Sequence, residues 1–355
     1  MIQRFLVKLL LSPLSLLYGV GVSIRLLFYR IGLLKSIKFD IPTIAVGNLS
    51  IGGAGKSPHI EYLVRLLREY INVATLSRGY RRKTKGYLEV QRNNTATEVG
   101  DEPLQFKRKF PDVVVAVSES RTLAIPQIVS TYPNIQCVLL DDAFQHLPID
   151  PGLNILLTEF SKPFTRDWLL PSGRLREPRS GYHRADVIVV SKCPEILTPE
   201  DRKKLTEELN LYSHQQIFFS FYRYQQPYYI FQSKYKAKLD ADIDVLLICA
   251  IAGSKYLIEY LEKKVGSVAA LEYEDHHYFN KSDLGNLKRR FEAMDGGKKV
   301  IITTEKDAMR LAEHSQFLTE NKLPVFVLPI QVAFHNEDGH GFNNYIKDYL
   351  LKFKV

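Results

Sequence analysis

The chain carries the stretch VGNLSIGGAGKSP at residues 46–58, between two segments of different periodicity. A short apolar run at 41–46 comes before it, and residues 58–70 after it place apolar side chains at helical spacing. A strand, a glycine-rich loop and a helix in this order are typical of a phosphate-binding loop. Ser50 departs from the general pattern, which has Gly at this first position. A glycine-rich turn without a ligand is the alternative.

The residue types in this loop suit the phosphates of a nucleotide. Gly52, Gly53 and Gly55 let backbone N–H groups point at phosphate oxygens. Lys56 supplies a positive charge, and Ser57 supplies a hydroxyl at the start of the helix that can bind Mg²⁺. We therefore expect a nucleotide at this loop.

Further apolar runs predict an open α/β sheet. They lie at 72–76, 113–117, 137–140, 154–157 and 187–190, and such continuous runs suit parallel strands that are buried on both faces. We predict a P-loop NTPase-like, mostly parallel core over residues 36–215, with a helix that starts at the cap Thr198 near its end.

A second, smaller α/β domain is predicted over residues 241–355. It begins with an apolar run at 245–251, continues through 299–303 and 325–329, and ends in a short helix near 345–351. Between the two domains, the aromatic-rich runs 217–224 and 228–232 predict a two-stranded hairpin linker over 216–240.

The N-terminal segment 1–35 predicts a hydrophobic helix that associates with a membrane. No residue from 9 to 24 is charged, but Pro13, Gly19 and Gly21 interrupt this run, which is shorter than the roughly 20 residues a spanning helix needs. We therefore expect an anchor on the membrane surface; a helix packed on the protein's own core is the alternative. The basic residues that would suit an anionic surface are Arg4, Lys8, Arg25, Arg30, Lys35 and Lys38.

Charge and cysteine content limit the function classes. The formal net charge of +9 favours nucleic acid, an anionic membrane or a phosphorylated substrate as partner. No nucleic-acid recognition module is evident, so we expect no nucleic-acid partner. Cys137, Cys193 and Cys249 are far apart, which indicates neither a disulfide framework nor a zinc site and favours a reducing cytosol.

Two acidic pairs are candidates for chemistry. CVLLDDAFQH (137–146) places Asp141 and Asp142 after an apolar run, where a magnesium nucleotide needs carboxylates, although turn residues are the alternative. EVGDEPLQF (98–106) places Asp101 and Glu102 at the expected start of a helix, where capping is the alternative.

Two further stretches carry basic and imidazole groups. DWLLPSGRLREPRSGYHR (167–184) gathers arginines around apolar residues, as an anionic amphiphile would require, although it is also compatible with a solvated loop. YEDHHYF (273–279) puts His276 and His277 after Asp275, which is compatible with a proton relay or with a surface pair.

The stretch FNKSD (279–283) spells a guanine-recognition signature but does not predict a GTPase. It follows a polar segment rather than a buried strand, so it indicates a helix start capped by Ser282 or Asp283.

Seven blocks, taken in order, resemble one known family. They are VGNLSIGGAGKSP, SRGY (77–80), VGDEP, LLDDAFQH, LLPSGRLREP, DHH and TTEKDAMRL (303–311). Together they resemble the tetraacyldisaccharide 4′-kinases of lipid A synthesis. Ser50 agrees with the pattern of that family, whereas Ala143 stands where Gly is more usual.

The resemblance implies ATP as phosphoryl donor, Mg²⁺ as cofactor and the 4′-hydroxyl of tetraacyldisaccharide 1-phosphate as acceptor. It implies an ATP site at Ser50, Ile51, Gly52, Gly53, Ala54, Gly55, Lys56 and Ser57, and a metal site at Ser57, Asp141 and Asp142. Asp101 would be the base, with His276 pairing with it across an interdomain cleft, and Lys56 would contact the β- and γ-phosphates. Candidates for substrate binding are Arg174, Arg176, Asn48 and Arg78.

The resemblance also implies a place on the cytoplasmic face of the inner membrane, with no obligate protein partner inferred. The alternative function is a membrane-associated P-loop ATPase that acts as a switch or assembly factor. It would share the loop and Asp141 but would not need Asp101 beside the γ-phosphate.

Overall fold

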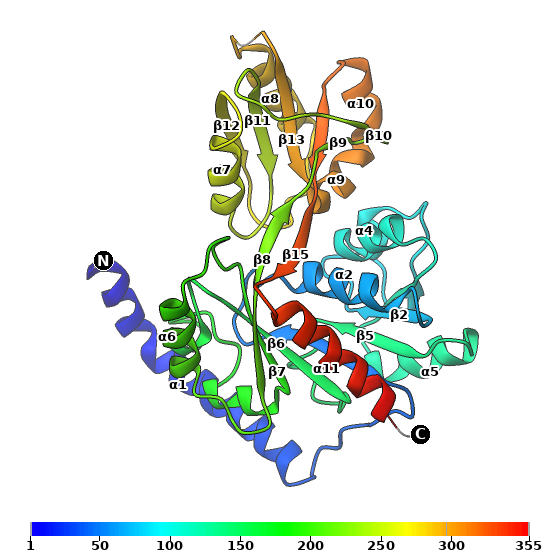
Figure 1. Ribbon diagram of the computed structural model, residues 1–355, viewed down its shortest axis with the longest axis vertical. Coiled ribbons are helices and arrows are strands. Elements are labelled where there is room, and N and C mark those ends of the chain that lie inside the picture. Colours follow the sequence, from blue (N-terminus) through cyan, green and yellow to red (C-terminus); the bar gives the residue numbers. More distant parts are fainter. Residues whose placement is uncertain (1, 296, 354–355) are drawn as a thin grey trace. The chain divides into compact units, whose positions relative to one another are not determined.

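The computed structural model describes residues 2–295 and 297–353, with side chains of the first helix described from Leu9 onward (Figure 1). The chain forms two compact units. Unit 1 holds the described residues up to Arg78, Val113–Tyr222 and those from Val332 on; unit 2 holds Gly79–Asp112 and Arg223–Gln331. This division differs from the expected boundaries, because an early segment of the chain belongs to unit 2 and the C-terminal segment belongs to unit 1.

Unit 1 contains the predicted parallel sheet. Its strand order is β8 (Gln216–Tyr224), β7 (Val187–Ser191), β6 (Leu153–Glu159), β1 (Thr43–Asn48), β5 (Cys137–Asp141), β2 (Val73–Ser77) and β4 (Val114–Val117), and each adjacent pair is parallel. β15 (Ile330–Phe334) lies beside β8. Every residue of β1, β5 and β7 is buried, which confirms that the apolar runs are strands covered on both faces.

The helices of unit 1 include the predicted phosphate-loop helix and the capped helix. α2 (Lys56–Leu67) follows β1, α5 is Arg121–Thr131, and α6 (Pro199–Leu209) begins after Thr198, whose side chain accepts from the Asp201 N–H. Two short 3₁₀ helices, η1 (Phe164–Arg166) and η2 (Arg179–Arg184), lie in the loop before β7.

The C-terminal helix α11 (Asp338–Lys352) is longer than predicted and packs on unit 1 instead of completing the second domain. The Phe342 ring lies 5.5 Å from that of Phe218 and 5.9 Å from that of Tyr62. The Tyr349 hydroxyl donates to the carbonyl of Thr43 in β1. The aromatic face of α11 therefore covers the large sheet.

The N-terminal helix α1 (Ile2–Arg30) continues through Pro13. Its segment Leu9–Arg30 is long and apolar enough to cross a membrane by length and composition, and 11% of its most apolar stretch is buried. This low burial argues against the alternative that α1 is a core helix. Arg25, Arg30, Lys35 and Lys38 are exposed, whereas the side chains of Arg4 and Lys8 lie outside the described part.

α1 contacts the rest of unit 1 through small and polar residues. Ser15 is buried and its hydroxyl donates to the Ser172 hydroxyl at 2.8 Å, while Tyr18 donates to the carbonyl of Arg176 at 2.7 Å. The large apolar side chains point away from the protein: Leu10 is 79% exposed and Leu16 is 70% exposed. This arrangement is the reverse of a soluble amphipathic helix.

Unit 2 contains a second, smaller sheet. Its order is β10 (Gln232–Lys236), β9 (Tyr228–Tyr229), β14 (Val325–Leu328), β13 (Lys299–Thr304), β11 (Asp244–Cys249) and β12 (Ser267–Glu272). β12, β11, β13 and β14 are parallel, and β9 is antiparallel to β14 and β10. Side chains of β11 alternate between two core clusters, one with Leu284 and Leu287 and one with Leu257 and Leu261.

Unit 2 also contains several helices and one short strand. They are α3 (Ala96–Val99), α4 (Asp101–Lys109), α7 (Lys255–Glu262), α8 (Lys281–Glu292), α9 (Glu305–Leu311), η3 (Ala312–His314) and α10 (Ser315–Glu320), with the short strand β3 (Leu88–Glu89) before α3. α4 and α9 pack against each other, which joins the early segment of the chain to the late one.

Two local predictions were wrong. The runs 217–224 and 228–232 do not pair with each other, because β8 adds to the large sheet beside β7 and β9 pairs with β14 and β10. The FNKSD stretch does begin a helix, α8, but the N-cap is Asn280, whose side chain accepts from the N–H groups of Ser282 and Asp283. Asp283 instead completes a capping box by accepting from the Asn280 N–H.

Candidate active site

The backbone of the glycine-rich loop explains why Ser50 can replace glycine. Ser50 forms an antiparallel bridge with Leu175, and the Ile51 N–H donates to the Arg174 carbonyl at 2.7 Å. Within this fully described loop, positive φ angles occur at Gly52 (111°) and Gly55 (91°). Since Ser50 does not adopt a left-handed conformation, a side chain at this position costs no backbone strain.

Two side chains of unit 1, from Ser191 and His59, form hydrogen bonds with backbone carbonyl groups of the loop. The Ser191 hydroxyl donates to the Ala54 carbonyl at 2.7 Å, and His59 Nδ1 lies 2.7 Å from the Gly55 carbonyl oxygen. His59 Nε2 lies 3.0 Å from the Ser220 hydroxyl. Burial lowers the pKa of His59 to about 4, so the ring is neutral and donates from Nδ1 to Gly55. Sequence reasoning missed His59, although it follows Gly55 by one helical turn.

Lys56 joins a charged network at the carboxyl ends of β1 and β5. Its Nζ donates to Asn48 Oδ1 at 3.1 Å and lies 3.8 Å from Asp142 Oδ2. Arg176 donates to the same Asn48 oxygen at 2.7 Å and to Asp142 Oδ1 at 2.9 Å. Burial would raise the pKa of Asp142, but Lys56 and Arg176 outweigh it and lower this pKa to about 2. The phosphate loop, the acidic pair after β5 and the arginine-rich stretch, which were predicted separately, therefore contact one another through Lys56, Asp142 and Arg176.

The two aspartates of the strand-end pair differ in environment. Asp141 is the last residue of β5, pairs in register with Val46 and is 4% exposed. Asp142 follows with φ 47°, and its side chain is 39% exposed. The left-handed residue of this turn is thus Asp142, so Ala143 in place of Gly leaves the turn intact.

The chemistry of Ser57, Asp141 and Asp142 fits a magnesium ion that also binds phosphate. Among residues 2–295 and 297–353, no group of three or more His, Cys, Asp or Glu side chains is arranged to hold a metal. Magnesium uses one or two carboxylates and completes its shell with water and phosphate oxygens. A hydroxyl and two carboxylates beside a phosphate loop meet that requirement.

The four arginines of the arginine-rich stretch have different partners. One contacts the phosphate-loop region, and three pair with other residues of the same stretch. Arg174 Nε donates to Asp167 at 2.8 Å, Arg179 donates to the Asp167 carbonyl, and Arg184 pairs with Glu177 at 2.8 Å. Arg176 alone of the four contacts Asp142. Arg78, the fourth candidate for substrate binding, is exposed after β2.

An apolar pocket of about 410 Å³ lies beside α1 in unit 1. Its lining includes Leu16, Val20 and Ile24 of α1, and Leu169 of the arginine-rich stretch. The pocket brings the exposed face of α1 next to the segment that holds Arg174 and Arg176.

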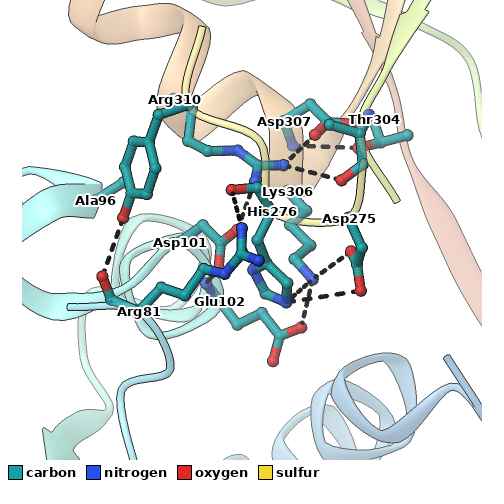
Figure 2. A network of polar contacts seen from close by, with 12 residues as sticks. Arg81, Ala96, Asp101, Glu102, Asp275, His276, Thr304, Lys306, Asp307 and Arg310 are labelled. Carbon is teal, nitrogen blue, oxygen red and sulfur yellow. Dashed lines mark hydrogen bonds and ion pairs between the residues drawn. The ribbon is translucent and has the colours of Figure 1, made fainter. Parts of the chain in front are cut away.

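Asp101 and His276 form a buried pair within unit 2 (Figure 2). His276 Nδ1 lies 3.0 Å from Asp101 Oδ2, and Asp101 is 5% exposed. The expected pairing is present, but its expected position across an interdomain cleft is wrong, because α4 belongs to the same unit as His276. Burial favours the neutral acid, yet His276, Lys306 and Arg310 outweigh this effect and lower the pKa of Asp101.

The position of His276 distinguishes it from His277. His276 has a left-handed backbone with φ 62°, its ring centroid lies 4.9 Å from that of Tyr80, and its carbonyl accepts from Arg81. His277 instead lies 2.8 Å from Asp283, at the capping box of α8. A strained backbone that the surroundings hold in place is common at functional sites.

Two cations on α9, Lys306 and Arg310, contact the group formed by Asp101, Glu102 and His276. The sequence analysis did not identify either of them. Lys306 Nζ lies 3.0 Å from Glu102 and 2.9 Å from His276 Nε2. Arg310 is fully buried and lies 3.4 Å from Asp101 while pairing with Asp307. Their spacing of four residues, which puts both on one helix face, was the available signal.

Comparison with known proteins finds one family that matches nearly the whole chain. Residues 7–350 match the family model described as Tetraacyldisaccharide-1-P 4'-kinase, LpxK. The chain belongs to this family.

Curated relatives named Tetraacyldisaccharide 4'-kinase are similar over nearly the whole chain. The relative from Bacteroides thetaiotaomicron is 41% identical over 352 residues, covering 96% of this chain and 92% of the relative. The one from Flavobacterium johnsoniae is 42% identical and covers 97% and 99%. A crystal structure of LpxK from Aquifex aeolicus in complex with ATP is similar with a TM-score of 0.71 and 26% identity, covering 97% of this chain and 99% of that one. The predicted P-loop α/β fold with an N-terminal apolar helix is thereby confirmed.

Proposed function

We propose that this chain transfers the γ-phosphoryl group of ATP to the 4′-hydroxyl of tetraacyldisaccharide 1-phosphate. Membership of the LpxK family supports this reaction, and the ATP complex of the Aquifex aeolicus protein supports ATP as donor. The observation that carries the proposal is the buried Asp101–His276 pair. An ATPase switch needs no oriented carboxylate for an acceptor hydroxyl, so this pair favours the kinase.

Unit 1 binds ATP in this proposal. Backbone N–H groups of the loop bind the phosphates, except those of Ile51 and Ala54, which donate to the carbonyls of Arg174 and Gly52. The Lys56 ammonium moves from Asp142 toward the β- and γ-phosphates. Ser57, Asp141 and Asp142 would hold Mg²⁺, which would neutralise negative charge on the phosphates. Arg176 stays beside the loop during the reaction, because it is hydrogen-bonded to Asn48 and Asp142.

Unit 2 supplies the base. Asp101 is ionised at neutral pH because its pKa is lowered, and it accepts the proton of the 4′-hydroxyl as the sugar oxygen bonds to the γ-phosphorus and ADP leaves. The substrate hydroxyl must lie in line with the γ-phosphorus when Asp101 takes its proton. Little covalent work falls to the protein beyond this positioning.

The lipid substrate and the membrane surface are assigned to the α1 region. The exposed apolar side chains of α1 suit the acyl region of a membrane, and exposed Arg25 and Arg30 suit anionic headgroups. The apolar pocket lined by Val20 and Leu169 suits an acyl chain. We propose that α1 holds the protein at a membrane surface, and that this surface is the cytoplasmic face of the inner membrane, as the family resemblance implies.

A transfer assay tests the proposal. Purified protein is incubated with γ-labelled ATP and tetraacyldisaccharide 1-phosphate in detergent micelles, and the lipids are separated by chromatography. With the wild type we expect label in a bisphosphorylated lipid, and with Lys56→Ala we expect none. Arg65→Ala is the control, because Arg65 lies on the same helix and its side chain pairs with Glu61; its transfer should be near normal. ATP hydrolysis that ignores the lipid, without labelled lipid, would favour the switch instead.

A further inference from the structure

Lys306 lies among three carboxylates and one imidazole of unit 2 (Figure 2). Its Nζ is 3.0 Å from Glu102, 3.6 Å from Asp275 and 2.9 Å from His276 Nε2, and the side chain is 17% exposed. Burial alone would lower the pKa of Lys306, but Glu102, Asp101 and Asp275 outweigh burial and raise this pKa. Lys306 is therefore an ammonium group at neutral pH.

An ammonium group restricts what its imidazole neighbour can carry. It has three N–H donors and no acceptor, so at 2.9 Å from Lys306 Nζ the His276 Nε2 atom must be the acceptor. A neutral imidazole that accepts at Nε2 carries its proton on Nδ1. His276 Nδ1 faces Asp101 Oδ2 at 3.0 Å, so the Nδ1–H group donates to the carboxylate.

We propose that Lys306 is a positioning residue for phosphoryl transfer, because it holds His276 in the Nδ1–H form that donates to Asp101. His276 then orients the carboxylate and does not take up the proton of the substrate hydroxyl. The assignment to phosphoryl transfer rests on the proposed function, with Asp101 as base; the assignment of the tautomer does not.

The other groups around His276 cannot replace Lys306 in this role. Asp275 lies 3.9 Å from His276 Nε2, which is too far for a hydrogen bond, and it would favour a proton on that nitrogen. Arg310 contacts Asp101 at 3.4 Å, and its guanidinium otherwise pairs with Asp307 and donates to the Ala250 carbonyl. Tyr80 contacts the face of the ring and so limits its tilt without selecting a tautomer. Without Lys306, no ammonium group faces His276 Nε2, and Asp275 is the charged group left beside that nitrogen.

Nitrogen NMR of the intact protein tests the tautomer directly. The two ring nitrogens resonate far apart in a neutral imidazole and close together in an imidazolium, and the His276→Gln spectrum assigns the signal by difference. In the wild type we expect a proton on Nδ1 and none on Nε2. In Lys306→Met we expect a proton on Nε2, and in Lys306→Arg the wild-type pattern.

Lys109 provides a matched control. It pairs with Glu305 at 2.6 Å, joins the same two helices α4 and α9, and has a side chain that is 19% exposed. Lys109→Met removes an equally buried cation from the same helix pair without touching His276. Its His276 signals should match the wild type.

Kinetics extend the test to the reaction. Lys306→Met should lower kcat on the order of tenfold with little change in KM, which is less than the 10² to 10⁴ expected for loss of a general base. Lys306→Arg and Lys109→Met should stay close to wild type. In a His276→Gln background, Lys306→Met should have no further effect on kcat, because the residue through which it acts is gone.

Each outcome bears on one claim. A wild-type ring protonated at Nε2, or a Lys306→Met spectrum like that of the wild type, overturns the proposal even if the variant enzymes are inactive. A wild type that transfers no phosphoryl group overturns the proposed function and leaves the tautomer to be judged by NMR. If Lys306→Met does not fold, the wild-type and Lys306→Arg spectra still decide the tautomer.

Discussion

The carboxylate of Asp101 and the imidazole of His276 lie 3.0 Å apart although 175 positions separate them in the chain. Asp101 begins α4 and its second oxygen accepts from the Glu102 N–H at 2.9 Å. One carboxylate oxygen is therefore held by the backbone of its own helix, and the other by a side chain from the later of the two chain segments that form unit 2. This fixes the carboxylate plane before any substrate arrives.

Asp101→Ala is expected to lower kcat by about 10² to 10⁴ because it removes a positioned general base. KM should change much less. His276→Ala should lose less, and the double variant should resemble Asp101→Ala, since His276 then has no carboxylate to orient. The measurement is a double-mutant cycle on kcat with folding verified by circular dichroism. Multiplicative losses would show that the two residues act independently.

The buried His59 predicts that unit 1 loses stability in mild acid. Its pKa is about 4 in the folded protein and about 6.5 in an unfolded chain, so below pH 6.5 the unfolded state binds a proton that the folded state does not. Stability therefore falls as pH is lowered, by about 2 kcal/mol from this group between pH 7 and pH 5. Below about pH 4 the group contributes no further change.

Urea unfolding of wild type and His59→Asn at pH 7 and pH 5 measures this contribution. The variant lacks a titrating ring, so its stability deficit relative to wild type should shrink at pH 5. The His146 pKa is also lowered to about 4, which makes subtraction of the variant, rather than the wild-type curve alone, the informative comparison. A deficit that does not change with pH would contradict the neutral, buried ring.

Asp141→Asn/Asp142→Asn is expected to need far more magnesium for activity than the wild type. Both changes preserve shape while removing the negative charge that a hard cation requires. Titration of the initial rate with Mg²⁺ at fixed ATP gives the half-saturating concentration. Asp167→Asn, which changes a carboxylate that binds Arg174 outside the loop, serves as the control. Unchanged titration curves would remove the pair from the metal site.

Deletion of residues 1–30 is expected to move the protein from the membrane to the soluble fraction. A point variant tests the same surface without deletion: Leu10→Glu/Leu17→Glu places charge on two leucines that are 79% and 69% exposed. Its binding to anionic vesicles should fall, because charged side chains disfavour the apolar interface. Tyr70→Glu, at an 80% exposed site elsewhere in unit 1, should bind normally. Equal vesicle binding by the wild type, Leu10→Glu/Leu17→Glu and Tyr70→Glu would show that α1 is not the anchor.

Local sequence determined the phosphate loop and its flanking elements. The order of apolar run, glycines, Lys56 and helical spacing specifies β1, the loop and α2, because each signal lies within a few residues of the next. Asp141 and Asp142 were predictable in the same way, as the residues that end a buried strand. Parallel pairing of β1 with β5 then brings them to Lys56, since carboxyl ends of parallel strands share one edge.

Only the tertiary structure decided which distant segments share a unit. Packing of α4 on α9 puts Asp101 with His276 in unit 2, and pairing of β8 with β7 removes the hairpin that local periodicity predicted. Lys306 joins the pair through the same packing. Periodicity reports which face of an element is apolar, but the partner of that face depends on the shape and burial of all other elements, and no short stretch of this sequence encodes that choice.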